Sequence, residues 1–122
     1  TGIPSEAAAG HLILLVGAAP ADLRAIRPVL NDLCKEIIHF GPVGAGTAYK
    51  LMVNLMGSVQ LAALAEGLVI AQRAGLNRAI VVDALIKGAP ASPQVIRNAK
   101  RMRDDDHDII TFPGKWRLTR TA

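Results

Sequence analysis

The apolar positions in the first third of the chain predict a strand, a helix and a second strand. The run His11–Val16 is short, apolar and rich in β-formers, as a buried strand is. Apolar residues then recur at helical spacing over Ala21–Lys35, where Pro28 marks a kink or a later start. The second short strand, Glu36–Phe40, is stopped by the Gly-Pro pair that follows it. This order predicts a βαβ unit.

From Ala45 the pattern changes to one long helix that ends at Gly75. About 30 residues pass without proline, which gives a helix about 45 Å long. The segment is apolar nearly all round, which predicts a central helix that is buried on several sides. Gly57 and Gly67 lie inside it and cost up to about 1 kcal/mol each relative to alanine. We therefore expect another helix to cross closely at these glycines.

The remaining pattern predicts two shorter helices. Asn77 is a good N-cap for a helix over Arg78–Lys87. Ser92, followed by a proline, fits the N-cap of a further helix over Pro93–Arg103. Beyond that helix the periodicity is lost, and Phe112–Gly114 is typical of a turn. The chain as a whole is therefore predicted to be mixed α/β, with its strands first and its helices after them.

The composition is that of about one globular domain with an aliphatic core. The chain has 122 residues, of which 51% are hydrophobic but only 3% are aromatic. We therefore expect Ala, Leu, Ile and Val to fill the core. Cys34 is the single cysteine, so no internal disulfide can form, which suits a reducing cytoplasm. We interpret Cys34 as a small apolar filler.

The net charge is +4, and the basic excess is concentrated late in the chain. These basic residues are Arg97, Lys100, Arg101, Arg103, Lys115, Arg117 and Arg120. Nucleic-acid binding is one interpretation of the cluster, and a docking surface for a cofactor phosphate is another. Because aspartates interrupt the run and no aromatic residues are interleaved to stack bases, the pattern favours a solvated helix face and no nucleic-acid partner.

The segment Leu51–Ala71 is long and apolar enough to raise the question of a transmembrane helix. It contains Asn54, Ser58, Gln60 and Glu66, and a glutamate at the centre of a bilayer is costly. We therefore expect a buried protein helix and no membrane partner.

The stretch Gly41–Asn54, GPVGAGTAYKLMVN, is a glycine-rich turn that runs directly into the long helix. A P-loop would need Lys and then Ser or Thr after Gly46, where Thr47 and Ala48 stand, so that interpretation fails. A dinucleotide fingerprint would need glycine in place of Tyr49, and an acidic residue after a following strand. What remains is a tight strand-to-helix turn, whose first free N–H groups form a weak anion site.

Lys50 and Asn54 are the candidate chemistry of this stretch. They share one face of the helix, and Ser58 continues the same stripe. Polar side chains in an apolar helix must find partners or a ligand. Apolar surroundings disfavour the ammonium form of a lysine, so such a residue can give and take protons near neutral pH. The spacing leaves an alternative open, in which Lys50 extends to solvent and Asn54 bonds a neighbouring backbone.

The pattern G-x-x-G-x-G-x-x-x-K-x-x-x-N over Gly41–Asn54 resembles the catalytic motif of the β-hydroxyacid dehydrogenases. That family includes 3-hydroxyisobutyrate dehydrogenase, tartronate semialdehyde reductase and 6-phosphogluconate dehydrogenase. Upstream, Thr1–Leu12 has T-G followed by A-x-x-G-x-L, which resembles the family's substrate-binding loop and the strand after it. The resemblance extends to about Trp116.

The resemblance implies a role for each matching residue. Lys50 is the general acid/base, which protonates the carbonyl oxygen during reduction or takes the hydroxyl proton during oxidation. Hydride passes directly between substrate and nicotinamide, and Asn54 holds the substrate near the reacting oxygen. Thr1 and Gly2 stand where the family usually has Ser-Gly-Gly and would anchor the substrate carboxylate. Ile3 replaces the last of those glycines.

The resemblance also implies an architecture and a function. Residues 1–44 are expected to end a Rossmann-type dinucleotide-binding domain, and residues 45–122 to begin an all-helical domain. The implied function is part of an oxidoreductase that uses NAD or NADP and acts on a small 3-hydroxyacid or on its semialdehyde or keto form. A homodimer or higher homo-oligomer through the long helix and a cytoplasmic location belong to the same expectation. The alternative is a non-catalytic helical dimerisation module derived from that family.

Two departures from the family pattern limit what the chain is expected to do alone. The family's GxGxxG phosphate turn is not found in this sequence. The family's lysine that approaches the cofactor would fall near Thr119 and Arg120, where no lysine stands, so no cofactor-binding residue is assigned. We expect no metal site. The chain is thus expected to be a fragment, inactive on its own.

Overall fold

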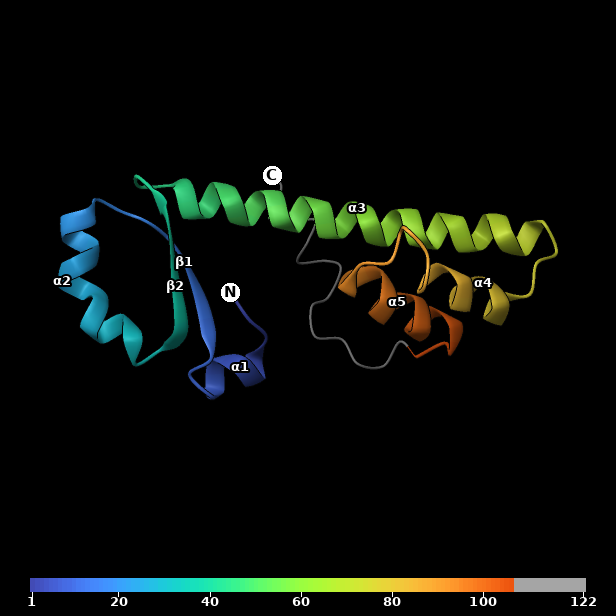
Figure 1. Cartoon of the computed structure of the whole chain (residues 1–122), viewed down its shortest axis with the longest axis horizontal. Coiled ribbons are helices and arrows are strands. Elements are labelled where there is room, and N and C mark those ends of the chain that lie inside the picture. Colours follow the sequence, from blue (N-terminus) through green and yellow to red (C-terminus); the bar gives the residue numbers. More distant parts are fainter. Residues whose placement is uncertain (107–122) are drawn as a thin grey trace. The chain divides into compact units, whose positions relative to one another are not determined.

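The computed structural model describes residues 1–106, and it confirms the predicted mixed α/β class with a long central helix (Figure 1). The elements are α1 (Pro4–Ala8), β1 (Leu12–Gly17), α2 (Pro20–Asn31), β2 (Cys34–Gly41), α3 (Ala45–Arg73), α4 (Arg78–Leu85) and α5 (Pro93–Arg103). The chain divides into two compact units, Thr1–Leu55 and Met56–Ala122, so α3 begins in the first and ends in the second. The domain boundary predicted between 44 and 45 falls at the start of α3 and stays a prediction.

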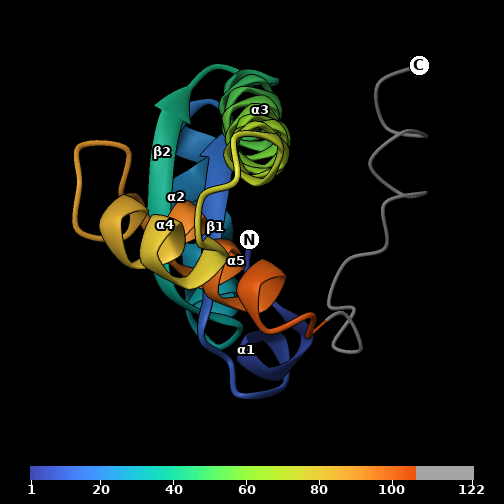
Figure 2. The same cartoon turned by 90° about the vertical axis from the view of Figure 1, so that its right-hand side faces the viewer.

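The first unit contains the βαβ arrangement that the sequence predicts. β1 and β2 form a two-stranded parallel sheet and lie side by side in both views (Figures 1 and 2). In the register of the sheet, Leu14 pairs with Ile37 and Leu15 pairs with Ile38. α2 connects the two strands, since a parallel pair requires a crossover.

The elements of the first unit differ from the prediction in their limits and in their burial. α2 ends at Asn31, earlier than predicted, because the Leu33 N–H turns back to the Leu30 oxygen at 3.0 Å and Cys34 already begins β2. Pro28 lies inside α2 and does not delay its start. The residues of β1 are half-buried rather than buried. A strand pair without further strands among residues 1–106 leaves these side chains partly open.

The end of β1 and the start of α3 meet backbone to backbone. A Cβ atom on Gly46 would lie 2.3 Å from the carbonyl oxygen of Leu15, and one on Gly17 would lie 2.4 Å from the oxygen of Pro42. Real side chains do not approach a backbone so closely, so both positions require glycine. This contact favours the interpretation of the glycine-rich turn as a structural joint from sheet to helix.

The second unit has a small aliphatic core, as the composition predicts. Leu64 of α3, Val82 of α4, and Val95 and Ala99 of α5 are buried together. α4 and α5 lie side by side in both views (Figures 1 and 2). Val82 is the largest fully buried side chain among the described residues, so the core is held by small aliphatic groups rather than aromatic rings.

Both N-caps predicted for this unit are confirmed. Asn77 Oδ1 accepts two backbone N–H groups of the first turn of α4, at 3.0 and 3.2 Å. Ser92 Oγ accepts the N–H of Val95 at 3.1 Å and donates to Oε1 of Gln60 at 2.8 Å. Gln60, a polar residue of the apolar α3, is therefore bound to the N-cap of α5.

The expectation that α3 is buried on several sides is wrong for the part of the chain that the structure describes. Its buried residues are Gly46, Leu64 and Ala71. Val59 and Ile70 are 57% and 66% exposed, because α4 and α5 cover only one side of the second half of the helix. By length and composition α3 could cross a membrane, so the expected lack of a membrane partner stays a prediction.

The close helix crossing expected at the glycines of α3 is also wrong within residues 1–106. A Cβ atom on Gly67 would meet no atom of these residues within 4 Å. A Cβ atom on Gly57 would meet only the Nε2 atom of Gln94, at 3.9 Å. The glycines are therefore not explained by close packing inside this part of the chain.

Two residues of the late basic cluster, Arg101 and Arg103, are paired with aspartates, and Arg97 donates to Gln94 Oε1. The hydrogen bond between Arg103 and Asp104, at 2.7 Å, lowers the pKa of that carboxyl and raises the pKa of the guanidinium. The ion pairs are Arg78–Asp105, Arg101–Asp106, Arg103–Asp83 and Arg103–Asp104. This pairing supports a solvated helix face over a nucleic-acid surface. Lys115, Arg117, Arg120 and the predicted turn at Phe112–Gly114 lie outside the described residues.

We predict opposite effects for one substitution at two positions of α3. Gly46→Ala forces a methyl group against the Leu15 carbonyl and should lower the free energy of unfolding by about 1–3 kcal/mol, as overpacking does. Gly67→Ala meets open space and should raise it by up to about 1 kcal/mol, through helix propensity. Urea unfolding followed by circular dichroism measures both variants. Equal effects at the two positions would contradict the close backbone contact.

A second prediction concerns the Arg103–Asp104 pair. Because the pKa of Asp104 is lowered in the folded protein, its contribution to stability is present above the ordinary aspartate pKa of about 3.9. That contribution is lost as the pH falls through the lowered value. A carbon-13 NMR titration should place the Asp104 midpoint below the ordinary aspartate value, and Arg103→Gln should move it upward. An unchanged midpoint in the variant would show that the pair does not form in solution.

Candidate functional site

Two predicted site residues meet in the first unit. Lys50 Nζ, on the second turn of α3, donates a hydrogen bond to Thr1 Oγ1 at 2.7 Å. The two residues are 49 positions apart in the sequence, so the contact depends on the fold and not on local spacing. Lys50 is half-buried and Thr1 is exposed, so an amine and a hydroxyl lie together where a small molecule can reach them.

The loop that carries Thr1 is held at both of its ends. The backbone N–H of Ile13 in β1 donates to the Thr1 oxygen at 3.0 Å, and the Thr1 nitrogen donates back to the Ile13 oxygen. At the other end, Glu6 Oε2 accepts the N–H of Ile3 at 2.8 Å. Thr1 is thereby fixed along the edge of β1, and Ile3 is fixed to the first turn of α1.

Lys50 is positioned by the contacts of the first turns of α3. The backbone of Gly46 rests on Leu15 of β1, as described above. The Tyr49 ring stacks on the Phe40 ring of β2, with ring centroids 4.2 Å apart and the planes 21° from parallel. Since one contact is made to each strand, the helix can neither slide nor rotate freely, and the direction of the Lys50 side chain is set.

Gly2 and Asn54 lie beside this contact. Gly2 sits between the two anchored residues of the loop, and a Cβ atom on it would lie 2.8 Å from Glu6 Oε2 and 2.9 Å from Leu12 Cδ2. Asn54 is one helical turn beyond Lys50 on α3 and is exposed. The structure thus brings Lys50 to Thr1 and leaves the roles of Gly2 and Asn54 as predictions.

Sequence reasoning missed the residues that support the site. Glu6 follows Ile3 at the spacing of a capping box, and that signal could have identified it. The stacked pair of Phe40 and Tyr49 had no comparable signal, because the two rings come from different elements and the partner of an aromatic ring is not encoded in its neighbours.

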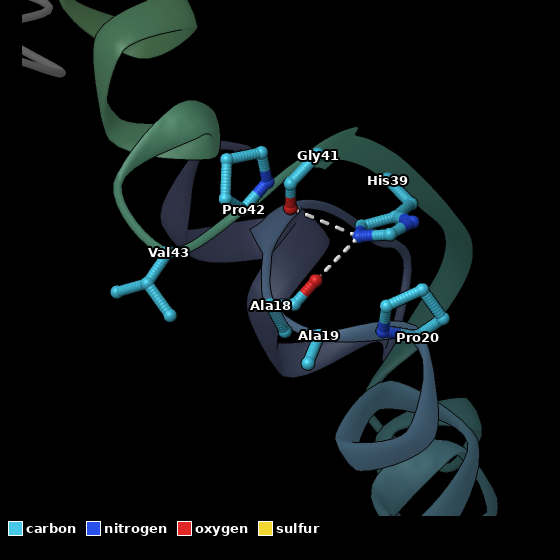
Figure 3. A pocket seen from close by; sticks show the side chains of 7 residues that line it. All are labelled: Ala18, Ala19, Pro20, His39, Gly41, Pro42 and Val43. Atoms are coloured by element: carbon cyan, nitrogen blue, oxygen red, sulfur yellow. Dashed lines mark hydrogen bonds between the residues drawn. The ribbon is translucent and has the colours of Figure 1, made fainter.

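A pocket of about 580 Å³ opens at the carboxyl ends of β1 and β2 (Figure 3). In open α/β sheets this edge is where ligands commonly bind. The pocket is lined by Ala18, Ala19, Pro20, His39, Gly41, Pro42 and Val43. No predicted site residue is among them. The pocket wall is apolar except for one histidine, so the Lys50–Thr1 contact stays the candidate for the chemistry.

The one ionisable side chain of the pocket is engaged by the backbone. His39 Nε2 lies 2.9 Å from the oxygen of Ala18 and 3.0 Å from the oxygen of Gly41, and Figure 3 shows both contacts as dashed lines. The ring therefore links the end of β1 to the end of β2. A residue used in this way has a structural role.

Gly46 and Ala45, in the first turn of α3, do not form an open phosphate-binding turn. A phosphate-binding turn needs glycine backbone that a ligand can approach. Here the backbone of Gly46 is covered by β1, and the N–H of Ala45 is bonded to the Pro42 oxygen at 3.0 Å. Within residues 1–106 no three His, Cys, Asp or Glu side chains are grouped to hold a metal ion. What the site can do is donate or accept a proton and bind a small polar group.

Comparison with known protein families gives one match that covers more than half of the chain. Residues 44–110 match a family model described as NAD-binding of NADP-dependent 3-hydroxyisobutyrate dehydrogenase. The match begins at the glycine-rich turn and includes the whole of α3, with Lys50 and Asn54.

Two of the curated proteins similar to the chain are named as dehydrogenases. A probable 3-hydroxyisobutyrate dehydrogenase of Mycobacterium tuberculosis is 42% identical over 83 residues, which are 68% of this chain and 28% of the relative. The 2-(hydroxymethyl)glutarate dehydrogenase of Eubacterium barkeri is 42% identical over 77 residues, which are 63% of this chain and 26% of the relative.

Solved structures show the same fold. The 3-hydroxyisobutyrate dehydrogenase of Salmonella typhimurium matches with a TM-score of 0.70 at 25% identity, over 88% of this chain and 38% of that one. The Mycobacterium tuberculosis enzyme, solved with L-serine, matches with a TM-score of 0.69 at 32% identity, over 93% of this chain and 35% of that one. The chain therefore spans between about a quarter and two-fifths of the length of these relatives.

Proposed function

Because the chain belongs to the 3-hydroxyisobutyrate dehydrogenase family, whose model matches residues 44–110, we propose that it is part of an NAD(P)-dependent oxidoreductase. The enzyme transfers a hydride between the nicotinamide cofactor and a small 3-hydroxyacid or its semialdehyde or keto form. The family uses nicotinamide dinucleotides, which agrees with the expected cofactor, NAD or NADP. A cytoplasmic location is part of the same proposal.

The Lys50–Thr1 contact of 2.7 Å is the observation that supports this function. In the reductive direction the Lys50 ammonium donates a proton to the carbonyl oxygen of the substrate. In the oxidative direction the neutral amine takes the proton of the hydroxyl group. Thr1 and Gly2 anchor the substrate carboxylate beside it, and Asn54 holds the substrate near the reacting oxygen.

The cofactor supplies the hydride chemistry when it is bound. Because Gly46 and Ala45 do not form an open phosphate-binding turn, we propose that other residues of the full-length protein hold the dinucleotide phosphates. We therefore propose that the 122-residue chain is inactive alone and contributes the proton-transfer half of the site. Its own residues bind and orient the substrate and move one proton at the Lys50 nitrogen.

The proposal predicts a specific kinetic result for Lys50→Ala in the full-length protein that carries this chain. Removing a general acid/base should lower kcat by about 10²- to 10⁴-fold. Lys87→Ala is the matched control, because Lys87 is an exposed lysine beyond the end of α4 and far from Thr1 in sequence. Its kcat should stay within about twofold of the parent protein, since exposed side chains away from a site have small effects.

Circular dichroism and steady-state kinetics on both variants give the measurement. If Lys50→Ala folds normally and keeps near-normal turnover, Lys50 is not the general acid/base. Lys50→Arg separates charge from proton transfer, because arginine keeps the positive charge but does not release its proton near neutral pH. It should therefore be nearly as slow as the alanine variant.

The exposed apolar face of α3 supports a second candidate, a helical dimerisation module. In the second unit, Met56, Val59, Ala63, Glu66 and Ile70 recur at spacings of three and four residues, which places them along one side of the helix. We name these five residues the α3 stripe. Met56, Val59 and Ile70 are exposed in the single chain. Pairing of two stripes would remove these side chains from water, and the two functions are compatible.

This candidate predicts that a charge within the α3 stripe changes the oligomeric state. Val59→Lys should shift the chain from dimer to monomer at micromolar concentration, because a charged ammonium would replace an apolar side chain at the contact and lose its water. Gln72→Lys is the control, since Gln72 is exposed on α3 but lies outside the stripe. Sedimentation velocity measures both. A parent chain that is already monomeric at micromolar concentration rules the module out.

A further inference from the structure

A carboxylate of the chain itself lies against the loop that carries Thr1. Glu6 Oε2 accepts the N–H of Ile3 at 2.8 Å. The same oxygen lies 2.8 Å from the point where a Cβ atom on Gly2 would stand. The Glu6 carboxylate therefore covers the Gly2–Ile3 side of the loop, and the backbone donor at Ile3 is already used.

The two sides of the loop carry opposite charges. On the Thr1 side, the Lys50 ammonium is within hydrogen-bond distance of the loop. On the Ile3 side, the Glu6 side chain is exposed and forms no ion pair within residues 1–106. The Glu6 carboxylate therefore faces any molecule that lies along Gly2.

Resting on the function proposed above, we propose that Glu6 is a specificity-determining residue that selects hydroxyacids with one carboxylate over those with two. The single carboxylate is held at the Thr1 side, close to Lys50. The other end of the substrate extends along Gly2 toward Glu6. A methyl or hydroxyl group is accepted there, whereas a second carboxylate meets a like charge and finds the Ile3 donor already occupied.

The size of the effect follows from the spacing. Thr1 and Ile3 are two residues apart, which is at most about 7 Å of extended chain, and Glu6 Oε2 bonds the Ile3 N–H, so a second carboxylate that lies along Gly2 comes within roughly this distance of Glu6. Like charges at such a distance near a protein surface repel enough to change binding by about three- to tenfold, and salt screens the repulsion. Glu6 is thus expected to tune selectivity and not to abolish either reaction.

The test is the selectivity of the full-length protein that carries this chain. We would measure kcat/KM for 3-hydroxyisobutyrate, with one carboxylate, and for 2-(hydroxymethyl)glutarate, with two. Glu6→Gln removes the charge and keeps a carbonyl oxygen that can accept the Ile3 N–H. It should lower the preference for the monocarboxylate by about three- to tenfold, mainly through KM of the dicarboxylate. Glu36→Gln, which changes the same charge at an exposed position of β2, should leave the ratio unchanged.

Ionic strength gives a second measurement that needs no variant. Raising the salt concentration should weaken the preference of the parent protein for the monocarboxylate and leave that of Glu6→Gln unchanged. A purely structural role of Glu6 would move neither ratio. An unchanged ratio in the variant, or a parent preference that does not respond to salt, overturns the specificity role of Glu6. If the parent protein turns over neither substrate, the proposed function itself fails, which is a separate outcome.

Discussion

The position of the candidate site depends on the backbone contact between Gly46 and the end of β1. That contact fixes where α3 leaves the sheet, and Lys50 follows one turn later. Thr1 is tied to the other end of the same strand through Ile13. Contacts with the same strand therefore position both partners of the 2.7 Å hydrogen bond, although the two residues are 49 positions apart in the sequence. Displacing either end of β1 would separate them, so the site is only as rigid as this short strand.

Local signals explain how much of the fold could be predicted. The caps at Asn77 and Ser92 and the limits of α5 are decided by neighbouring residues, and the structure agrees with the prediction. The end of α2 was placed too late because apolar spacing continues into residues that a turn removes from the helix. The burial of α3 could not be predicted, since the sequence shows that the helix is apolar but not which elements cover it.

The candidate site divides in the same way. The motif identified Lys50 together with Thr1, and the fold brings those two side chains together. The capping-box spacing could have identified Glu6 as a partner of Ile3, but it does not reveal that the carboxylate lies against the loop that carries Thr1. The stacking of Phe40 on Tyr49 likewise arises from a crossing of two elements. Sequence reasoning identified the candidate proton-transfer residue and missed the residues that contact its helix and the Thr1 loop.

The hydrogen bonds of His39, which link the ends of the two strands, determine which of its ring nitrogens carries the hydrogen. Both partners of His39 Nε2 are carbonyl oxygens, which can only accept, so this nitrogen must carry the hydrogen. The neutral ring is therefore held as a single tautomer, with its lone pair on Nδ1. Nδ1 takes no part in these contacts, so within the ring the Nε2–H group alone joins the two strand ends.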